Sequence, residues 1–84
     1  MVYLGVNVDI YSVKELFKGE IFGNPQISQE RSVLINVNVD GKVVKMTLFK
    51  TGSMNIRGKG DQVMNKAYEI FMEKFEKVKF MVTI

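Results

Sequence analysis

The segment KVVKMTLFKTGSMNIRGKG, from Lys42 to Gly60, holds the residues of this chain best suited to recognising a ligand. It carries five basic residues and no acidic one, and apolar residues alternate in it with Lys, Thr, Phe, Asn and Arg. Such alternation places apolar side chains on one face of a strand and polar ones on the other. We expect a strand pair whose cationic face, with an aromatic ring, suits a polyanion such as nucleic acid.

Residue types for catalysis or metal binding are scarce. The chain has no Cys and no His, which removes the thiolate nucleophile, the disulfide, the commonest general base and the commonest zinc ligand. Glu69, Glu73 and Glu76 are interleaved with lysines at helical spacing, as on a solvated helix face. We therefore expect no catalytic residues, no metal site and no cofactor.

The glycines of the segment superficially resemble a phosphate-binding loop. From Gly52 to Lys59 the spacing is one residue too long, and Gly60 stands where Ser or Thr must bind magnesium. Gly58 and Gly60 can still let the chain turn tightly into a following helix, or offer backbone amides to one phosphate. The pattern argues against nucleotide hydrolysis.

Length and composition indicate one small globular domain, residues 1–84. The hydrophobic content is 46%, which is enough for a packed core. The net charge is +3, and it is concentrated in residues 43–84, which hold eight basic against four acidic residues, whereas residues 1–42 hold four against five. No apolar run approaches the roughly 20 residues of a membrane span, and the first residues lack a charged signal-peptide region. We expect an intracellular, cytoplasmic protein with no membrane partner.

The first half of the chain predicts a strand, a short helix and a loop. Apolar residues alternate over Tyr3–Ile10, as in a half-buried strand. Ser12 and Glu15 form a capping box for a helix over Val13–Lys18. The stretch Glu20–Gln29 contains a Gly-Asn-Pro turn and predicts a loop with a short edge strand.

The middle of the chain predicts a meander of three strands. Ser32–Val39 and Val43–Phe49 both alternate, and they are joined by Asp40 and Gly41, the pair typical of a type I′ hairpin turn. After a second turn, Ser53–Arg57 alternates again.

The last part predicts a long helix over Asp61–Lys77 with one wide apolar stripe, then a strand over Lys79–Ile84. That strand is expected either beside the first strand or at a dimer seam. The fold class is α+β, in the order β-α-β-β-β-α-β: a curved antiparallel sheet with two helices on one face and its other face open.

The element order and the stretch TLFKTGSMNIRGKG resemble one repeat of the TATA-box-binding protein (TBP-like) fold, which also occurs in the N-terminal domain of type 3 ribonuclease H. The resemblance spans roughly Tyr3 to Phe75. It implies a curved antiparallel sheet with two helices on its convex side and DNA in the minor groove on its concave side. By this resemblance, Phe49 falls at the position of a Phe that wedges between base pairs, and Ser32 falls where a second wedge Phe is expected. Asn55 and Arg57 fall at positions where the family has small side chains that contact the groove. Since the family has two repeats, DNA bending of that kind implies a homodimer.

Two functions of different classes remain open. The first is binding of DNA or an RNA–DNA duplex on the open sheet face. The alternative is a protein-interaction module that binds a transcription or replication protein, with Tyr3, Leu34 and Phe49 as apolar anchors. The candidate nucleic-acid-binding residues are Tyr3, Asn7, Asn36, Asn38, Lys45, Thr47, Phe49, Asn55 and Arg57.

Overall fold

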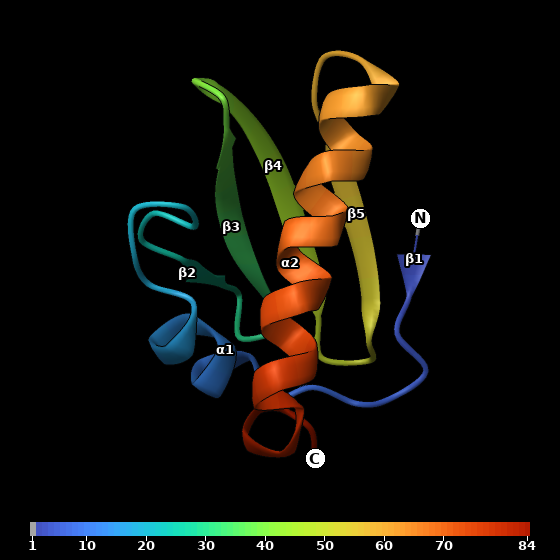
Figure 1. The fold of residues 1–84 in the computed structure, drawn as a ribbon. Helices are drawn as coiled ribbons and strands as arrows, with labels where there is room; N and C mark the ends of the chain where they lie inside the picture. The colour runs from blue at the N-terminus through green and yellow to red at the C-terminus, as the bar shows by residue number, and fades with distance from the viewer. Residues whose placement is uncertain (1) are drawn as a thin grey trace.

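The computed structural model describes residues 2–84 as a five-stranded antiparallel sheet with two helices (Figure 1). Met1, which belongs to the predicted domain, lies outside the described residues. The α+β class is confirmed, but the order of elements is β-α-β-β-β-β-α. It differs from the predicted order at the C-terminus, and it includes β2, the expected short edge strand that the predicted order did not count. The elements are β1 (Val2–Tyr3), α1 (Ile10–Leu16), β2 (Gln26–Ser28), β3 (Ser32–Val39), β4 (Lys42–Phe49), β5 (Ser53–Arg57) and α2 (Asp61–Val82).

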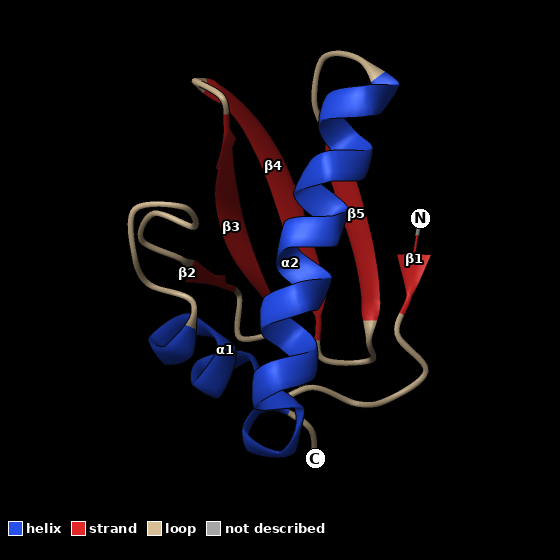
Figure 2. Ribbon diagram, viewed as in Figure 1, coloured by secondary structure: helices blue, strands red, loops and turns tan. Residues whose placement is uncertain are grey.

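The sheet has the strand order β1-β5-β4-β3-β2. Both helices lie on the same side of it, and the long helix α2 runs across the central strands (Figure 2). The other side carries neither helix. A two-layer arrangement therefore leaves one face of the sheet covered and one face open.

The core fills the space between the helices and the covered face. Every second residue of β3 and β4 is buried there, and α1 and α2 contribute aromatic and aliphatic side chains. The rings of Phe17 and Phe71 stack with centroids 5.1 Å apart, and those of Phe71 and Phe75 with centroids 5.8 Å apart. The Phe17–Phe71 contact attaches the end of α1, where Phe17 is the C-cap, to α2.

The first helix begins three residues earlier than predicted. Asp9, not Ser12, is its N-cap: the Asp9 carboxylate accepts a hydrogen bond from the Tyr11 backbone N–H at 3.1 Å and from the Ser12 hydroxyl at 2.9 Å. An aspartate satisfies the unpaired amides of a helix start well. The earlier start also brings Ile10 and Val13 onto one buried face.

The predicted strand Tyr3–Ile10 is wrong beyond Tyr3. Only Val2 and Tyr3 pair with β5, and the chain then crosses the end of the sheet before α1. The crossing is fixed by hydrogen bonds from the Leu4 N–H to the Gly52 carbonyl at 2.9 Å and from the Val8 N–H to the Lys50 carbonyl at 2.8 Å. Burial does alternate along this segment, because alternate side chains turn toward the core, but strand pairing does not accompany it.

Gly52 makes that crossing possible. Its φ of +92° is a conformation that favours glycine, and a Cβ at this position would collide with the Val6 carbonyl oxygen. The turn between β4 and β5 therefore determines how closely the N-terminal segment can approach the sheet.

The predicted final strand Lys79–Ile84 is also wrong, because α2 continues to Val82. Val82 is buried seven residues after the buried Phe75, so the apolar stripe of the helix continues past the predicted end. Only an isolated bridge joins Thr83 to Val8, and the Asp9 N–H donates to the Val82 carbonyl at 2.7 Å. The end of the chain thus anchors the start of α1 without adding a strand.

The predicted meander is confirmed. Asp40 and Gly41 have φ values of 51° and 82°, as a type I′ turn requires, and they join β3 to β4. The third strand has the predicted bounds, Ser53–Arg57, and the expected edge strand is β2, paired with β3.

Candidate functional site

The open face is the side of the sheet opposite the helices. On the central strands its side chains alternate with the buried residues, so the register of the strands decides which of them are neighbours. Among the predicted site residues, those that lie on this face are Tyr3, Asn36, Asn38, Lys45, Thr47, Phe49, Asn55 and Arg57.

Asn7 is the exception. It lies in the segment that crosses the end of the sheet, where its backbone carbonyl accepts a hydrogen bond from the Ile84 N–H at 3.1 Å. Asn7 was predicted to lie on the open face because a strand was predicted over Tyr3–Ile10, and that prediction is wrong beyond Tyr3. The structure therefore does not bring Asn7 together with the other candidates.

Two rows of polar side chains cross the middle of the open face. In one row Asn36 is paired with Lys45, and Lys45 with Arg57. In the next row Thr47 lies between Leu34 and Asn55. Residues directly opposite each other on neighbouring antiparallel strands have Cβ atoms about 5 Å apart, so each row is a set of close neighbours.

Lys45 and Arg57 form a pair of like charges within the first row. Both side chains are exposed, and neither belongs to any ion pair within residues 2–84. By contrast, Lys66 on α2 is 3.1 Å from the Asp40 carboxylate. Like charges directly opposite each other across strands are destabilising, so this pair is not explained by the stability of the sheet.

A hollow of about 350 Å³ lies over the middle of the open face. We call it the amide hollow, because four carboxamides line it: Asn24 before β2, Gln26 on β2, Asn36 on β3 and Asn55 on β5. Thr47, Leu34 and the Lys45–Arg57 pair complete its lining together with Ile35 and Met46.

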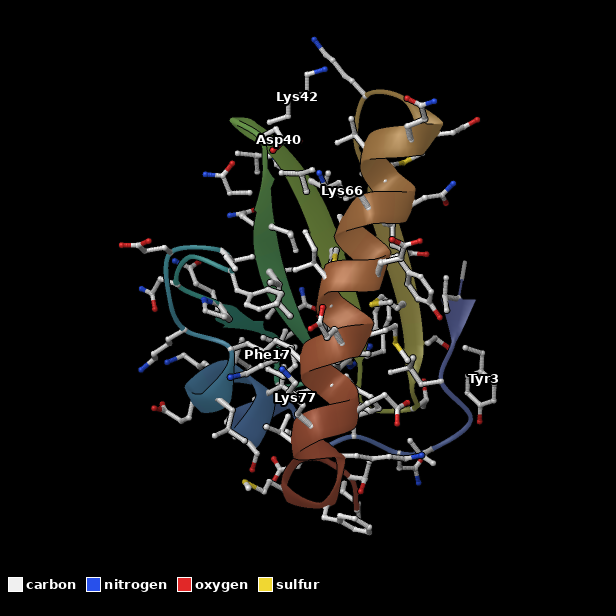
Figure 3. All side chains as sticks on the ribbon, viewed as in Figure 1. Tyr3, Phe17, Asp40, Lys42, Lys66 and Lys77 are labelled. Atoms are coloured by element: carbon white, nitrogen blue, oxygen red, sulfur yellow. The ribbon has the colours of Figure 1, made fainter. Side chains whose placement is uncertain are left out.

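A second hollow, of about 480 Å³, continues from the first toward the start of α2. We call it the cationic hollow: Lys42, Lys45, Arg57 and Lys59 line it together with Val43, Gly58 and Val63. Figure 3 shows Lys42 at the tip of the β3–β4 hairpin, beside Asp40. Among the described residues that line either hollow there is no Asp or Glu, so the charged residues of both linings are all basic.

Sequence reasoning missed Asn24, Gln26, Lys42 and Lys59 as members of the site. Asn24 and Gln26 belong to a stretch that predicted mainly loop, and Lys42 and Lys59 flank turns. The basic segment from Lys42 to Gly60 contained a signal for two of them, but nothing local indicated that both lysines face the same hollow.

The asparagines of the open face differ in their hydrogen bonds. The side-chain oxygen of Asn38 accepts a bond from the Gly41 N–H at 3.1 Å and so stabilises the hairpin turn. Within residues 2–84, the side chains of Asn36 and Asn55 make no hydrogen bond with protein groups. The structure thus explains Asn38 by local folding, whereas the amides of Asn36 and Asn55 remain available to a ligand.

Aromatic side chains lie at the opposite end of the open face from the cations. Tyr3 is 68% exposed, and Figure 3 shows its ring at the β1 edge, directed away from the core. Phe49 is partly buried, and its cross-strand partner is the buried Ser32. Along the open face of β4, the Thr47 row therefore separates Phe49 from the row of Lys45 and Arg57.

Residues 2–84 contain no group of three or more carboxylates placed to hold a metal ion, and no helix among them is long and apolar enough to cross a membrane. No protein-family model, curated protein sequence or solved structure matches this chain. The open face itself must carry the functional argument.

Proposed function

We propose that this protein is a small, non-catalytic nucleic-acid-binding protein that uses the open face of its sheet. The observation that carries the proposal is the Lys45–Arg57 pair, two like charges on adjacent strands with no ion-pair partner in residues 2–84. A phosphate backbone provides the negative charge that this arrangement lacks, and its binding releases counterions.

The surroundings of the pair support the same ligand. Lys42, the first residue of β4, and Lys59, between β5 and α2, extend the positive charge beyond the Lys45–Arg57 pair, and no carboxylate lines either hollow within the described residues. Carboxamides lie beside the cations, and amides are groups that read base edges. Charge for the backbone and hydrogen-bonding groups for the bases therefore occur side by side, as nucleic-acid recognition requires.

The resemblance to TBP-like repeats belongs to this proposal. It implies an antiparallel sheet with two helices on one face and a ligand on the other, and the observed two-layer arrangement agrees with that outline. Because the chain would correspond to one repeat, the resemblance also leads us to propose a homodimer that presents two such sheets to one nucleic acid.

A protein-interaction module is the second candidate function. It is favoured by the exposure of apolar side chains on the open face, with Leu34 41% and Tyr3 68% exposed, beside the partly buried Phe49. In that case these three side chains would anchor a protein partner involved in transcription or replication, and the lysines would form a solvated rim.

One titration separates the two candidates. Labelled duplex DNA, single-stranded DNA and an RNA–DNA hybrid are titrated with the protein at two salt concentrations, using the wild type and Lys45→Ala/Arg57→Ala. We expect binding that weakens with salt, and a double variant whose slope of log affinity against log salt is shallower by about 1.4 to 1.8, the contribution of two phosphate contacts.

The matched control is Lys77→Ala/Lys79→Ala, which removes the same charge from exposed positions on α2, in the other layer. Equal losses in the two double variants would show that only net charge matters and would count against the open face. Absence of binding to all three nucleic acids, together with a protein complex that is lost on Phe49→Ala, would decide for the interaction module.

A further inference from the structure

The amide hollow has the composition of a site for the edge of a base. Each carboxamide offers N–H donors and a carbonyl acceptor, and can therefore match the mixed donor and acceptor pattern of a base edge. Asn36 and Asn55 come from strands on either side of β4, and Gln26 lies beyond β3, so the amides surround the hollow. Its volume of about 350 Å³ lies in the range of sites that enclose small molecules.

Within the described part of the chain, the amides that line the hollow are all unengaged, whereas one amide elsewhere on the same face is not. Asn38, two residues after Asn36 on β3 and on the same face, has its side-chain oxygen engaged by the Gly41 N–H. The side chains of Asn24, Gln26, Asn36 and Asn55 make no hydrogen bond with protein groups within residues 2–84. Asn is also poorly suited to strands, so its use at Asn36 and Asn55 is not explained by strand formation.

A closed duplex fits this surface poorly. The amides come from β2, β3 and β5, so the face that must make contact is at least four strands wide, or about 14 Å between its outer backbones. That exceeds the roughly 6 Å width of the minor groove and the two-stranded ribbon that the major groove admits. Wide sheets enter the minor groove when apolar wedges force it open.

The open face has no fully exposed apolar side chain on its central strands β3 and β4 that could act as such a wedge. Phe49 is partly buried, and its cross-strand partner Ser32 is both small and buried. Tyr3, the exposed ring at the same end, lies on β1 at the edge of the sheet. An unpaired base needs no wedge, because its Watson–Crick edge is already accessible and its face can stack on an aromatic ring.

We infer that the nucleic acid recognised by this face is single-stranded, with an unpaired base in the amide hollow. The phosphates adjoining that base lie on Lys45 and Arg57, and the strand continues into the cationic hollow over Lys42 and Lys59. At the other end of the face, Tyr3 stacks a further base. This inference rests on the proposed function and specifies the class of its ligand.

The test compares a fluorescently labelled oligonucleotide of mixed sequence with the same oligonucleotide annealed to its complement, by anisotropy at one salt concentration. We expect the single strand to bind at least about tenfold more tightly than the duplex. Asn36→Ala/Asn55→Ala should weaken single-strand binding about tenfold or more, since each lost hydrogen bond corresponds to roughly two- to tenfold, and should leave duplex binding unchanged.

Asn65→Ala is the matched control, because Asn65 is an exposed asparagine on α2, in the other layer, and its replacement should change neither affinity. Circular dichroism melts of each variant verify that the fold is retained. Equal affinity for the two forms, or an equal loss for both in the double variant, overturns the inference while the proposed function stands. Absence of binding to either form overturns both.

Discussion

The two faces of β3, β4 and β5 are built from alternate residues of the same strands, yet they meet different requirements. On the covered face, Ile35, Met46 and Leu48 are almost completely buried, and their contribution is accounted for by the hydrophobic effect and packing. On the open face, Lys45 and Arg57 are opposed like charges that contribute nothing comparable to folding. The difference shows that packing accounts for the covered face but not for the like-charge pair of the open face, which the proposed function explains.

The open face itself divides in the same way. Asn38 stabilises the hairpin through its bond to Gly41, whereas Asn36, on the same strand and the same face, has no such bond within residues 2–84. Two asparagines on one strand and one face can therefore differ in structural role, and here the hydrogen bond to Gly41 distinguishes them.

The largest effect is expected from substitutions at two neighbouring residues of β4 whose side chains lie on opposite faces of the sheet. Met46→Lys places an unpaired ammonium in the core, which should cost several kcal/mol and leave a domain of this size largely unfolded. Lys45→Met removes a charge from the open face and should fold with wild-type stability or better. Urea denaturation followed by circular dichroism measures both. Similar unfolding of the two variants would mean that the faces are not distinct.

Truncation of the core should have the next largest effect. Phe71→Ala removes the middle ring of the stack formed with Phe17 and Phe75, and should lower the free energy of unfolding by about 3 to 5 kcal/mol. Phe80→Ala is the control, because Phe80 is 98% exposed at the end of α2 and its loss should change stability by less than about 0.5 kcal/mol. Thermal or urea denaturation gives both values.

The two asparagines of β3 should differ by a smaller amount. Asn38→Ala removes the bond to the Gly41 N–H and should lower the free energy of unfolding by about 0.5 to 1.5 kcal/mol. Asn36→Ala should change it by less than about 0.5 kcal/mol. If the two variants lose stability equally in urea denaturation, Asn36 also has a structural role, and the functional argument for its amide is weakened.

The smallest effect concerns the like-charge pair. Lys45→Ala should leave stability unchanged or raise it by about 0.2 to 1 kcal/mol at low salt, because repulsion from Arg57 is relieved. The gain should shrink as salt rises, since exposed charges are screened. Lys77→Ala on α2, where Lys77 lies 3.8 Å from Glu73, should show no such gain. A salt-independent loss of stability on Lys45→Ala would contradict a role in recognition alone.

Much of the central sheet could be predicted because its signals are local. Alternation gave the strands of the meander, and Asp40 and Gly41 gave the turn that sets the register of β3 against β4. Once that register is known, Asn36 must lie beside Lys45, whereas the place of Arg57 depends on the separate register of β5 against β4. The pairing of Asn36 with Lys45 was therefore within reach of sequence reasoning.

The ends of the chain could not be predicted in the same way. Alternation over Tyr3–Ile10 reflects burial against the core without strand pairing, because the segment crosses the end of the sheet and bonds to the turn around Gly52. The residues Lys79–Ile84 have side chains suited to a strand, but the buried Val82 extends the stripe of α2. In both places tertiary contacts overrode local preference.

The sequence by itself determined the α+β class, the meander and the cationic character of one face, because these depend on side-chain period and turn chemistry over a few residues. Only the tertiary structure decided that Asn24 and Gln26 join Asn36 and Asn55 around one hollow, and that Lys42 and Lys59 meet Lys45 and Arg57 in another. Those residues come from separate strands and loops, and their proximity depends on sheet order and on the path of the chain into α2, which no local pattern encodes.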